Sequence, residues 1–361
     1  MATLEPDPDR VTRRHRIVVV ARWTLGLGIA TVAVWVAVAA AGGLDDSWAA
    51  IRQLDAWWLV PAFVIEAASY LVLGAKLHRL IGRSVVSRGE AVELGLVVSG
   101  FGVLTPASPA EGLALVALHL RRRGVPRRRI TMVFAFSEWL SSRVFLALGA
   151  INLLVVAVIE RDPLSDLWPF VVAAIAVLML LGLTARMASQ PGAVERISQI
   201  AGWFRRPSRR LPVAVRRAKG AAWYRDAREL IGPARNRFVL AWLTALAVLA
   251  DAACLWFALF AAGAHVGYDV ALLSITVAAG SVFIPLVPGG IGIVEAAIPA
   301  VTRHFGVPYN EGFAAVLAYR ALSTFLPAGV GVLAIVDLRR RAPASGAESR
   351  SPSDDDAAGE Q

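Results

Sequence analysis

Apolar runs long enough to cross a bilayer recur along most of this 361-residue sequence. A helix needs about 20 mainly apolar residues to span the hydrocarbon core. The runs predict an all-α integral membrane protein with about six full spans, at Trp23–Gly42, Trp57–Leu77, Ile130–Ile159, Leu167–Met187, Phe238–Ala262 and Glu311–Leu338. The first run follows several arginines, as in a secretion signal. It is longer than a signal core of about 7 to 15 residues, so we expect it to remain in the membrane.

The basic residues fall mainly on one side of this predicted topology, and the formal net charge is +10. Arginines precede the first span, flank the third and fill the loop 188–236, whereas the intervening loops are acidic. The positive-inside rule therefore predicts a multi-pass protein of the cytoplasmic (inner) membrane with both termini in the cytoplasm. Because this charge is accounted for by topology, we expect no nucleic-acid partner. Residues 1–16 and 342–361 are polar and predict disordered tails around a membrane domain over 17–341.

Two further apolar stretches, Ala91–Leu120 and Ala271–Phe305, do not fit as ordinary spans. The charges around each place its two ends on the same side, so each is predicted to be re-entrant. Proline deletes a backbone donor and glycine weakens a helix, so each stretch should be two half-helices meeting near mid-membrane. Irregular backbone at that depth is tolerated only within protein or beside a water-filled cavity. The predicted breaks contain Pro106, Pro109, Pro285, Pro288, Gly289, Gly290 and Gly292.

Short strings recur in the same order in two halves of the chain, about 57–159 and 238–338. Glu66-Ala67-Ala68-Ser69 corresponds to Asp251-Ala252-Ala253-Cys254, and Gly124-Val125-Pro126 corresponds to Gly306-Val307-Pro308. The two halves begin on opposite sides of the predicted membrane, so the repeat is inverted. Inverted repeats with broken helices at the midplane are typical of alternating-access carriers.

Ionisable residues inside spans each cost about 2.5–3.5 kcal/mol on insertion scales, so they are candidate functional residues. The arginines come first, because a guanidinium keeps its charge and can bind phosphate through two parallel hydrogen bonds. Two alternatives stay open: these charges bind substrate, or they pair with one another and join helices. The candidates are Arg143, Arg320, Glu138, Glu295, Glu111, Glu66 and Asp251.

Glu111 also fits a structural role, since Ser108-Pro109-Ala110-Glu111 has the pattern of a capping box that opens a helix. The five histidines show no metal-ligand spacing, and no catalytic triad is evident. We therefore expect no metal, no cofactor and no enzymatic activity.

The strings Pro288-Gly289-Gly290-Ile291-Gly292-Ile293-Val294-Glu295 and Ala318-Tyr319-Arg320, with Leu326-Pro327 after them, resemble the flippase-like transmembrane region of the lysylphosphatidylglycerol synthase family. Thr105–Arg123 with Glu138 and Arg143 resembles the first half of that region, and the likeness covers about residues 15 to 340. Full-length synthases carry a large soluble catalytic domain after this region, whereas only a short tail follows Arg341. The resemblance therefore implies lipid translocation without aminoacyl transfer.

The expected function is thus a lipid flippase that moves a lipid with a charged or sugar head group between leaflets. The lipid partners implied are anionic, aminoacylated or polyprenyl-linked, and homo-oligomer formation stays open. Two alternatives remain: a secondary transporter for a small soluble anion, with the acids coupling protons, and a membrane-embedded transferase that uses a polyprenyl-linked sugar.

Overall fold

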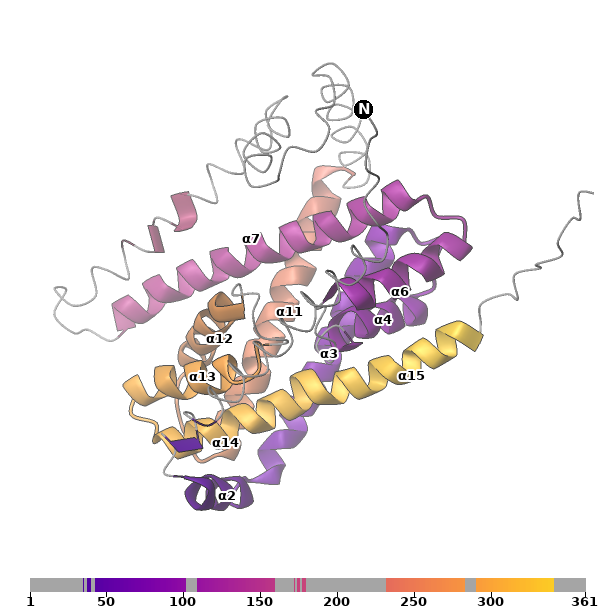
Figure 1. Cartoon of the computed structure of the whole chain (residues 1–361). Helices are drawn as coiled ribbons and strands as arrows, with labels where there is room; N and C mark the ends of the chain where they lie inside the picture. The colour runs from indigo at the N-terminus through magenta and orange to yellow at the C-terminus, as the bar shows by residue number, and fades with distance from the viewer. Residues whose placement is uncertain are drawn as a thin grey trace, which may run out of the picture.

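The computed structural model describes residues 43–101, 109–159, 232–282 and 290–340, with isolated positions at 35, 38–39, 172, 174–175 and 177–179. All regular structure within these ranges is helical (Figure 1). The helices are α2 (Leu44–Arg52), α3 (Ala56–Ile81), α4 (Arg88–Leu96), η1 (Val97–Phe101), α6 (Pro109–Arg122), α7 (Arg127–Ile159), α11 (Ala234–Ala261), α12 (Tyr268–Val282), α13 (Ile293–His304), α14 (Tyr309–Arg320), η3 (Ala321–Phe325) and α15 (Leu326–Arg340).

Four helices in the described ranges are long and apolar enough to cross a membrane. They cover Ala56–Ile81, Arg127–Val158, Arg235–Ala261 and Tyr309–Leu338, the last of which joins α14, η3 and α15. These helices coincide with four of the six predicted spans to within a few residues. The other two, Trp23–Gly42 and Leu167–Met187, lie almost wholly outside the described residues, as does the predicted basic loop 188–236.

Each stretch predicted to be broken contains separate helices. In the first, α4 and η1 end at Phe101 and α6 begins at Pro109; in the second, α12 ends at Val282 and α13 begins at Ile293. The second half-helix thus starts directly after Gly292, the last residue of the predicted break. Gly290 and Gly292 have φ of 66° and 86°, a conformation that favours glycine and ends regular helix before α13. Pro106, Pro285, Pro288 and Gly289 lie outside the described residues.

The two halves of the chain have the same element order: a long helix, a pair of shorter helical arms and a second long helix. The first long helices, α3 and α11, pack along each other, and the Asp55 N–H donates to the Ala261 carbonyl at 2.8 Å. The start of α3 therefore meets the end of α11, so the two helices are antiparallel. A core of small and branched side chains fills their contact, including Ala62, Ala252 and Leu255.

The last long helix of each half packs on the helical arms of the other half. Helix α7 contacts α12, and α15 contacts α4 and η1. Figure 1 shows α7 and α15 on opposite sides of the molecule, with α4 and α6 towards one end and α12 and α13 towards the other. This exchange interlocks the halves around the α3–α11 contact.

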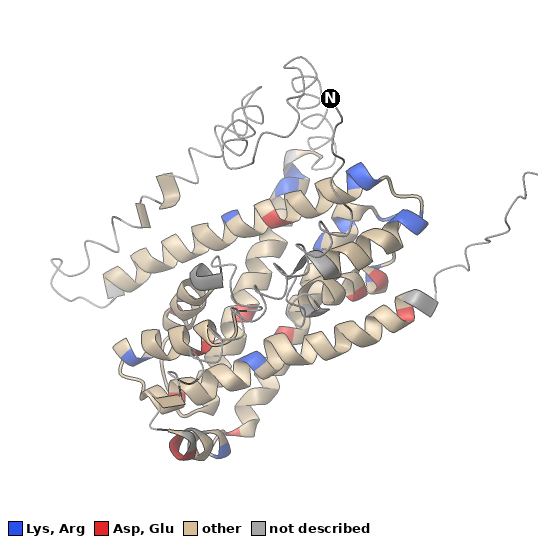
Figure 2. Cartoon of the chain, in the orientation of Figure 1, with Lys and Arg blue, Asp and Glu red and all other residues tan. Residues whose placement is uncertain are grey.

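The described basic residues gather mainly at one end of the bundle. Figure 2 shows them where α6 turns into α7, and the sequence there is Arg121–Arg123 followed by Arg127–Arg129. Fewer lie at the other end, which carries Arg52 and Arg303 among its described residues.

Candidate functional site

The centre of the candidate site is an ion pair between Arg320, at the end of α14, and Glu295, in the first turn of α13. Arg320 Nε lies 2.9 Å from Glu295 Oε1, and both residues are buried, with 6% and 5% of their surface exposed. Arg320 Nη1 also lies 3.5 Å from the Thr324 hydroxyl. In this structure Arg320 thus forms an internal ion pair with Glu295.

The second oxygen of the same carboxylate joins this pair to the helix break. Glu295 Oε2 accepts a hydrogen bond from the Gly292 N–H at 2.7 Å. A carboxylate at this position satisfies an otherwise unpaired donor and interacts favourably with the positive end of the α13 dipole. The positive φ of Gly292 aims its N–H at Glu295, so the glycine is part of the site's geometry.

Two further candidate acids meet where α3 packs on α11. Asp251 of α11 accepts a hydrogen bond from the Tyr319 hydroxyl at 2.9 Å and interacts electrostatically with Arg320. Glu66 of α3 is 5% exposed and interacts with Asp251, with the Cys254 thiol within hydrogen-bonding range. Arg320, Glu295, Asp251 and Glu66 thus form one polar cluster that draws on four helices.

A π-helical turn, η3, follows Arg320 directly and precedes Pro327. Because Pro327 has no N–H, it cannot bond the Ser323 carbonyl four residues earlier. The Tyr70 hydroxyl of α3 donates to that carbonyl instead, at 3.1 Å. Single π turns inside helices occur frequently at functional sites, and this one ties the helix carrying Arg320 to α3.

Arg143 and Glu138 lie on α7, apart from this cluster. The Arg143 guanidinium stacks over the Trp139 ring at 4.3 Å, and Glu138 is exposed. The structure therefore does not bring the two candidate arginines into one site.

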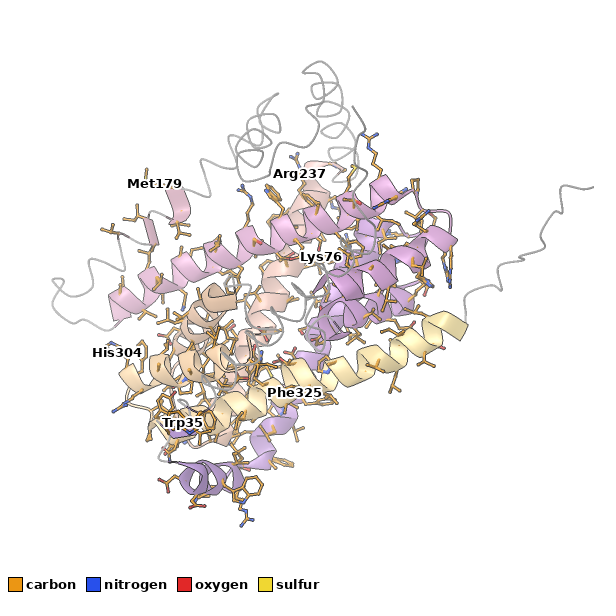
Figure 3. The ribbon with its side chains drawn as sticks, viewed as in Figure 1. Trp35, Lys76, Met179, Arg237, His304 and Phe325 are labelled. Atoms are coloured by element: carbon orange, nitrogen blue, oxygen red, sulfur yellow. The ribbon has the colours of Figure 1, made fainter. Side chains whose placement is uncertain are left out.

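Lys76 of α3 is a buried cation that was not among the predicted site residues, because it lies near the predicted end of its span. Lys76, labelled in Figure 3, is 5% exposed. Its Nζ donates to the Ser141 hydroxyl of α7 at 3.0 Å, and it interacts electrostatically with Glu138. The signal in the sequence was a lysine within an apolar run. That this lysine faces Glu138 and Ser141 is seen only in the packing of α3 on α7.

The remaining predicted positions fall at or beyond the limit of the described structure. Helix α6 begins at Pro109, as the capping-box pattern predicts, but Ser108 is outside the described residues, and the Glu111 side chain is not described. No group of three or more His, Cys, Asp or Glu residues in the described ranges could hold a metal ion.

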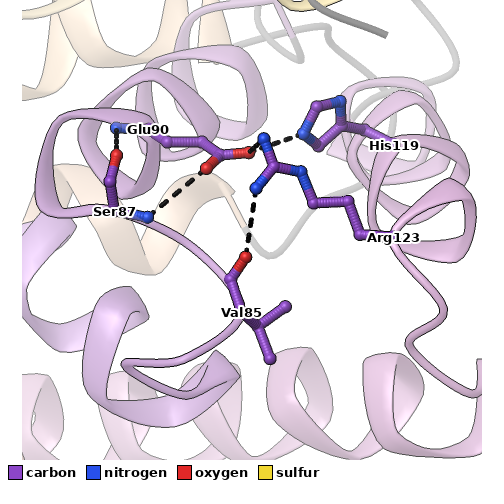
Figure 4. Close-up of polar contacts among 5 residues, drawn as sticks. All are labelled: Val85, Ser87, Glu90, His119 and Arg123. Atoms are coloured by element: carbon purple, nitrogen blue, oxygen red, sulfur yellow. Dashed lines mark hydrogen bonds and ion pairs between the residues drawn. The ribbon is translucent and has the colours of Figure 1, made fainter. Parts of the chain in front are cut away.

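A further buried acid, Glu90, joins the ends of α4 and α6 (Figure 4). Its Oε1 lies 2.7 Å from His119 Nε2 and 3.0 Å from an Arg123 guanidinium nitrogen, and its other oxygen forms a capping box with Ser87. Arg123 also donates to the Val85 carbonyl. These contacts are all local to the two helix ends, so we assign Glu90 and His119 a structural role.

The fold and this cluster define a multi-pass helical membrane protein with broken helices and a buried arginine at its polar centre. Residues 23–331 match the sequence profile of the lysylphosphatidylglycerol synthase transmembrane region, and the chain belongs to this family. The family is associated with lipid modification and lipid flipping. A search of curated proteins found no match.

Proposed function

We propose that this protein is a flippase that moves a lipid with a charged or sugar head group between the two leaflets of the cytoplasmic membrane. The main support for the proposal is the position of Arg320. It is a buried cation beside the second helix break, where the two halves of the chain meet. Carrying a phosphate through hydrocarbon without a partner is prohibitive, so a path for it needs fixed cations.

Glu295 indicates how Arg320 would receive a head group. Its carboxylate is an anionic group bound to the guanidinium at 2.9 Å, and a phosphate oxygen has the same charge and accepting geometry. In the absence of substrate Glu295 keeps the buried cation paired. An incoming phosphate competes for that position, while Glu295 retains the Gly292 N–H.

A hollow of about 250 Å³ between η1, α6 and α15 offers a place for acyl chains. Its lining is mainly apolar and includes Leu115, Leu118 and Ile335, whereas Arg122 and His119 contribute polar atoms. Leu118 is 48% exposed, so the hollow borders the outer surface of the bundle. Apolar walls beside Arg122 suit a phospholipid whose phosphate lies at the end of α6.

The same proposal includes the full topology: about six spans, two re-entrant arms and an inverted repeat with cytoplasmic termini. The antiparallel α3 and α11 support it, because the first helices of inverted halves must run in opposite directions. The exchanged contacts of α7 and α15 support it as well.

Cysteine labelling tests this topology in a Cys254→Ala background. We expect Arg88→Cys and Arg128→Cys, at the two ends of the α4–α6 arm, to react only with a membrane-impermeant thiol reagent applied from the cytoplasm. His265→Cys and His304→Cys, around α12–α13, should react only from outside. All four positions are exposed, so burial does not confound the assay. Labelling of Arg88→Cys and Arg128→Cys from opposite sides would show that the arm crosses the membrane.

Leaflet exchange in liposomes tests the function. We expect purified protein to exchange one class among labelled anionic, aminoacylated and polyprenyl-linked lipids. Arg320→Gln should slow exchange by about tenfold or more, because a hydrogen bond to a charged group is worth about 1.5–3 kcal/mol. The exposed Arg303→Gln, on α13 with Glu295, is the matched control and should exchange normally.

Arg143→Ala is measured in the same assay, and a comparable loss would place Arg143 on the lipid path too. The absence of exchange across the panel, with folded protein, would contradict the flippase proposal. Uptake of a soluble anion would then support the carrier alternative, and incorporation of labelled sugar would support the transferase.

A further inference from the structure

Glu66 and Asp251 occupy corresponding positions in the two halves and lie at the same depth along the α3–α11 helix pair. Glu66 lies ten residues after the first residue of α3, and Asp251 ten residues before the last residue of the antiparallel α11. At 1.5 Å per residue this is about 15 Å from the shared end, half of a hydrocarbon core of about 30 Å. The two carboxyl groups interact across the contact between the halves.

The charge balance of the cluster leaves these two acids without a full counter-charge. Its described members include three carboxyl groups and one guanidinium, and Glu295 pairs directly with Arg320. Two ionised carboxylates would then remain in a site that excludes water, close to each other, which is costly. Binding a proton removes one of these charges.

The surroundings distinguish the two acids. Groups that face them are Tyr70 on α3, Cys254 on α11, Tyr268 on α12, and Tyr319 and Arg320 on α14. Asp251 has the Tyr319 hydroxyl as donor. Glu66 has the Ser69 hydroxyl and the Cys254 thiol within hydrogen-bonding range. Its Oε2, however, is buried with no hydrogen-bond partner among the described residues. A proton on this oxygen would neutralise the site.

We propose that Glu66 and Asp251 form a proton-binding site, one carboxyl from each half, that couples lipid movement to proton movement. This rests on the proposed flippase function. An O–H bond forms on the pair when a proton enters from water on one side and breaks when the proton leaves to water on the other. Because each half contributes one acid, a movement of α3 against α11 changes the distance between the two carboxyl groups and their access to water.

Infrared difference spectroscopy tests the proton site without any lipid transport. We expect purified protein in nanodiscs to show a protonated carboxyl C=O band that changes as pH is varied across the neutral range. The band should be lost in Glu66→Gln and altered in frequency or titration in Asp251→Asn. Asp45→Asn, an exposed acid of α2, is the control and should leave it unchanged. An unchanged spectrum in Glu66→Gln would overturn the proton site.

Exchange with and without a pH gradient tests the coupling. A step of about one unit is a tenfold difference in proton activity, and we expect it to change the initial exchange rate of wild type severalfold. Asp45→Asn should keep both the exchange and its response to the gradient, whereas Glu66→Gln should lose the response. Wild-type exchange that ignores the gradient would overturn coupling and leave the flippase intact. No exchange in any condition would overturn the flippase and the coupling built on it, while the infrared result decides the proton site by itself.

Discussion

Arg320→Ala is expected to lower the free energy of unfolding by about 3–5 kcal/mol, because it leaves the Glu295 carboxylate buried without its cation. Both side chains are at most 7% exposed, so solvent screens the pair little. The Gly292 N–H remains as one partner for the carboxylate but carries no full charge. Denaturant or thermal unfolding in detergent micelles measures the loss.

A double variant separates stability from function at the same pair. Arg320→Gln with Glu295→Gln removes both charges together, and replacing a whole buried ion pair is often neutral. The glutamine amide that replaces the Glu295 carboxylate can still accept the Gly292 N–H through its oxygen. We therefore expect stability close to wild type but no lipid exchange. Wild-type exchange by this double variant would show that the pair only joins α13 to α14.

The sequence predicted the elements well because bilayer physics constrains them strongly. An apolar run between charged flanks has few alternatives to a spanning helix, and the four described spans lie where the runs do. At the second break, Gly290 and Gly292, two of the glycines in the predicted break, immediately precede α13. The sequence shows that glycines permit such a turn but not which of them takes a positive φ.

Partner assignments could not be made from the sequence, because they depend on how helices pack. Arg320 had Glu138, Asp251 and Glu295 as equally available partners, and only the approach of α13 to α14 selects Glu295. The Tyr70 bond to the Ser323 carbonyl joins residues 253 positions apart. Pro327 reveals that this carbonyl lacks its helical donor, but nothing local identifies the replacement.

The second large loss of stability is expected at Gly112, in the first turn of α6, where two helices are in close contact. A Cβ added there would lie 2.7 Å from the Val97 carbonyl oxygen and 3.2 Å from Val98 Cα. Both are backbone atoms of η1, which cannot turn aside as a side chain can. Gly112→Ala is therefore expected to lower the free energy of unfolding by about 2–3 kcal/mol.

The same substitution at Gly329 in α15 is the control, because nothing lies within 4 Å of a Cβ there. Gly329→Ala should leave stability unchanged or raise it by up to about 1 kcal/mol, since alanine is the better helix former. Because α6 and η1 are the two arms that flank the first break, pushing them apart should also reduce lipid exchange. Equal stability of the two alanine variants would show that α6 and η1 are not packed backbone to backbone, and the first helical arm would then need a different arrangement.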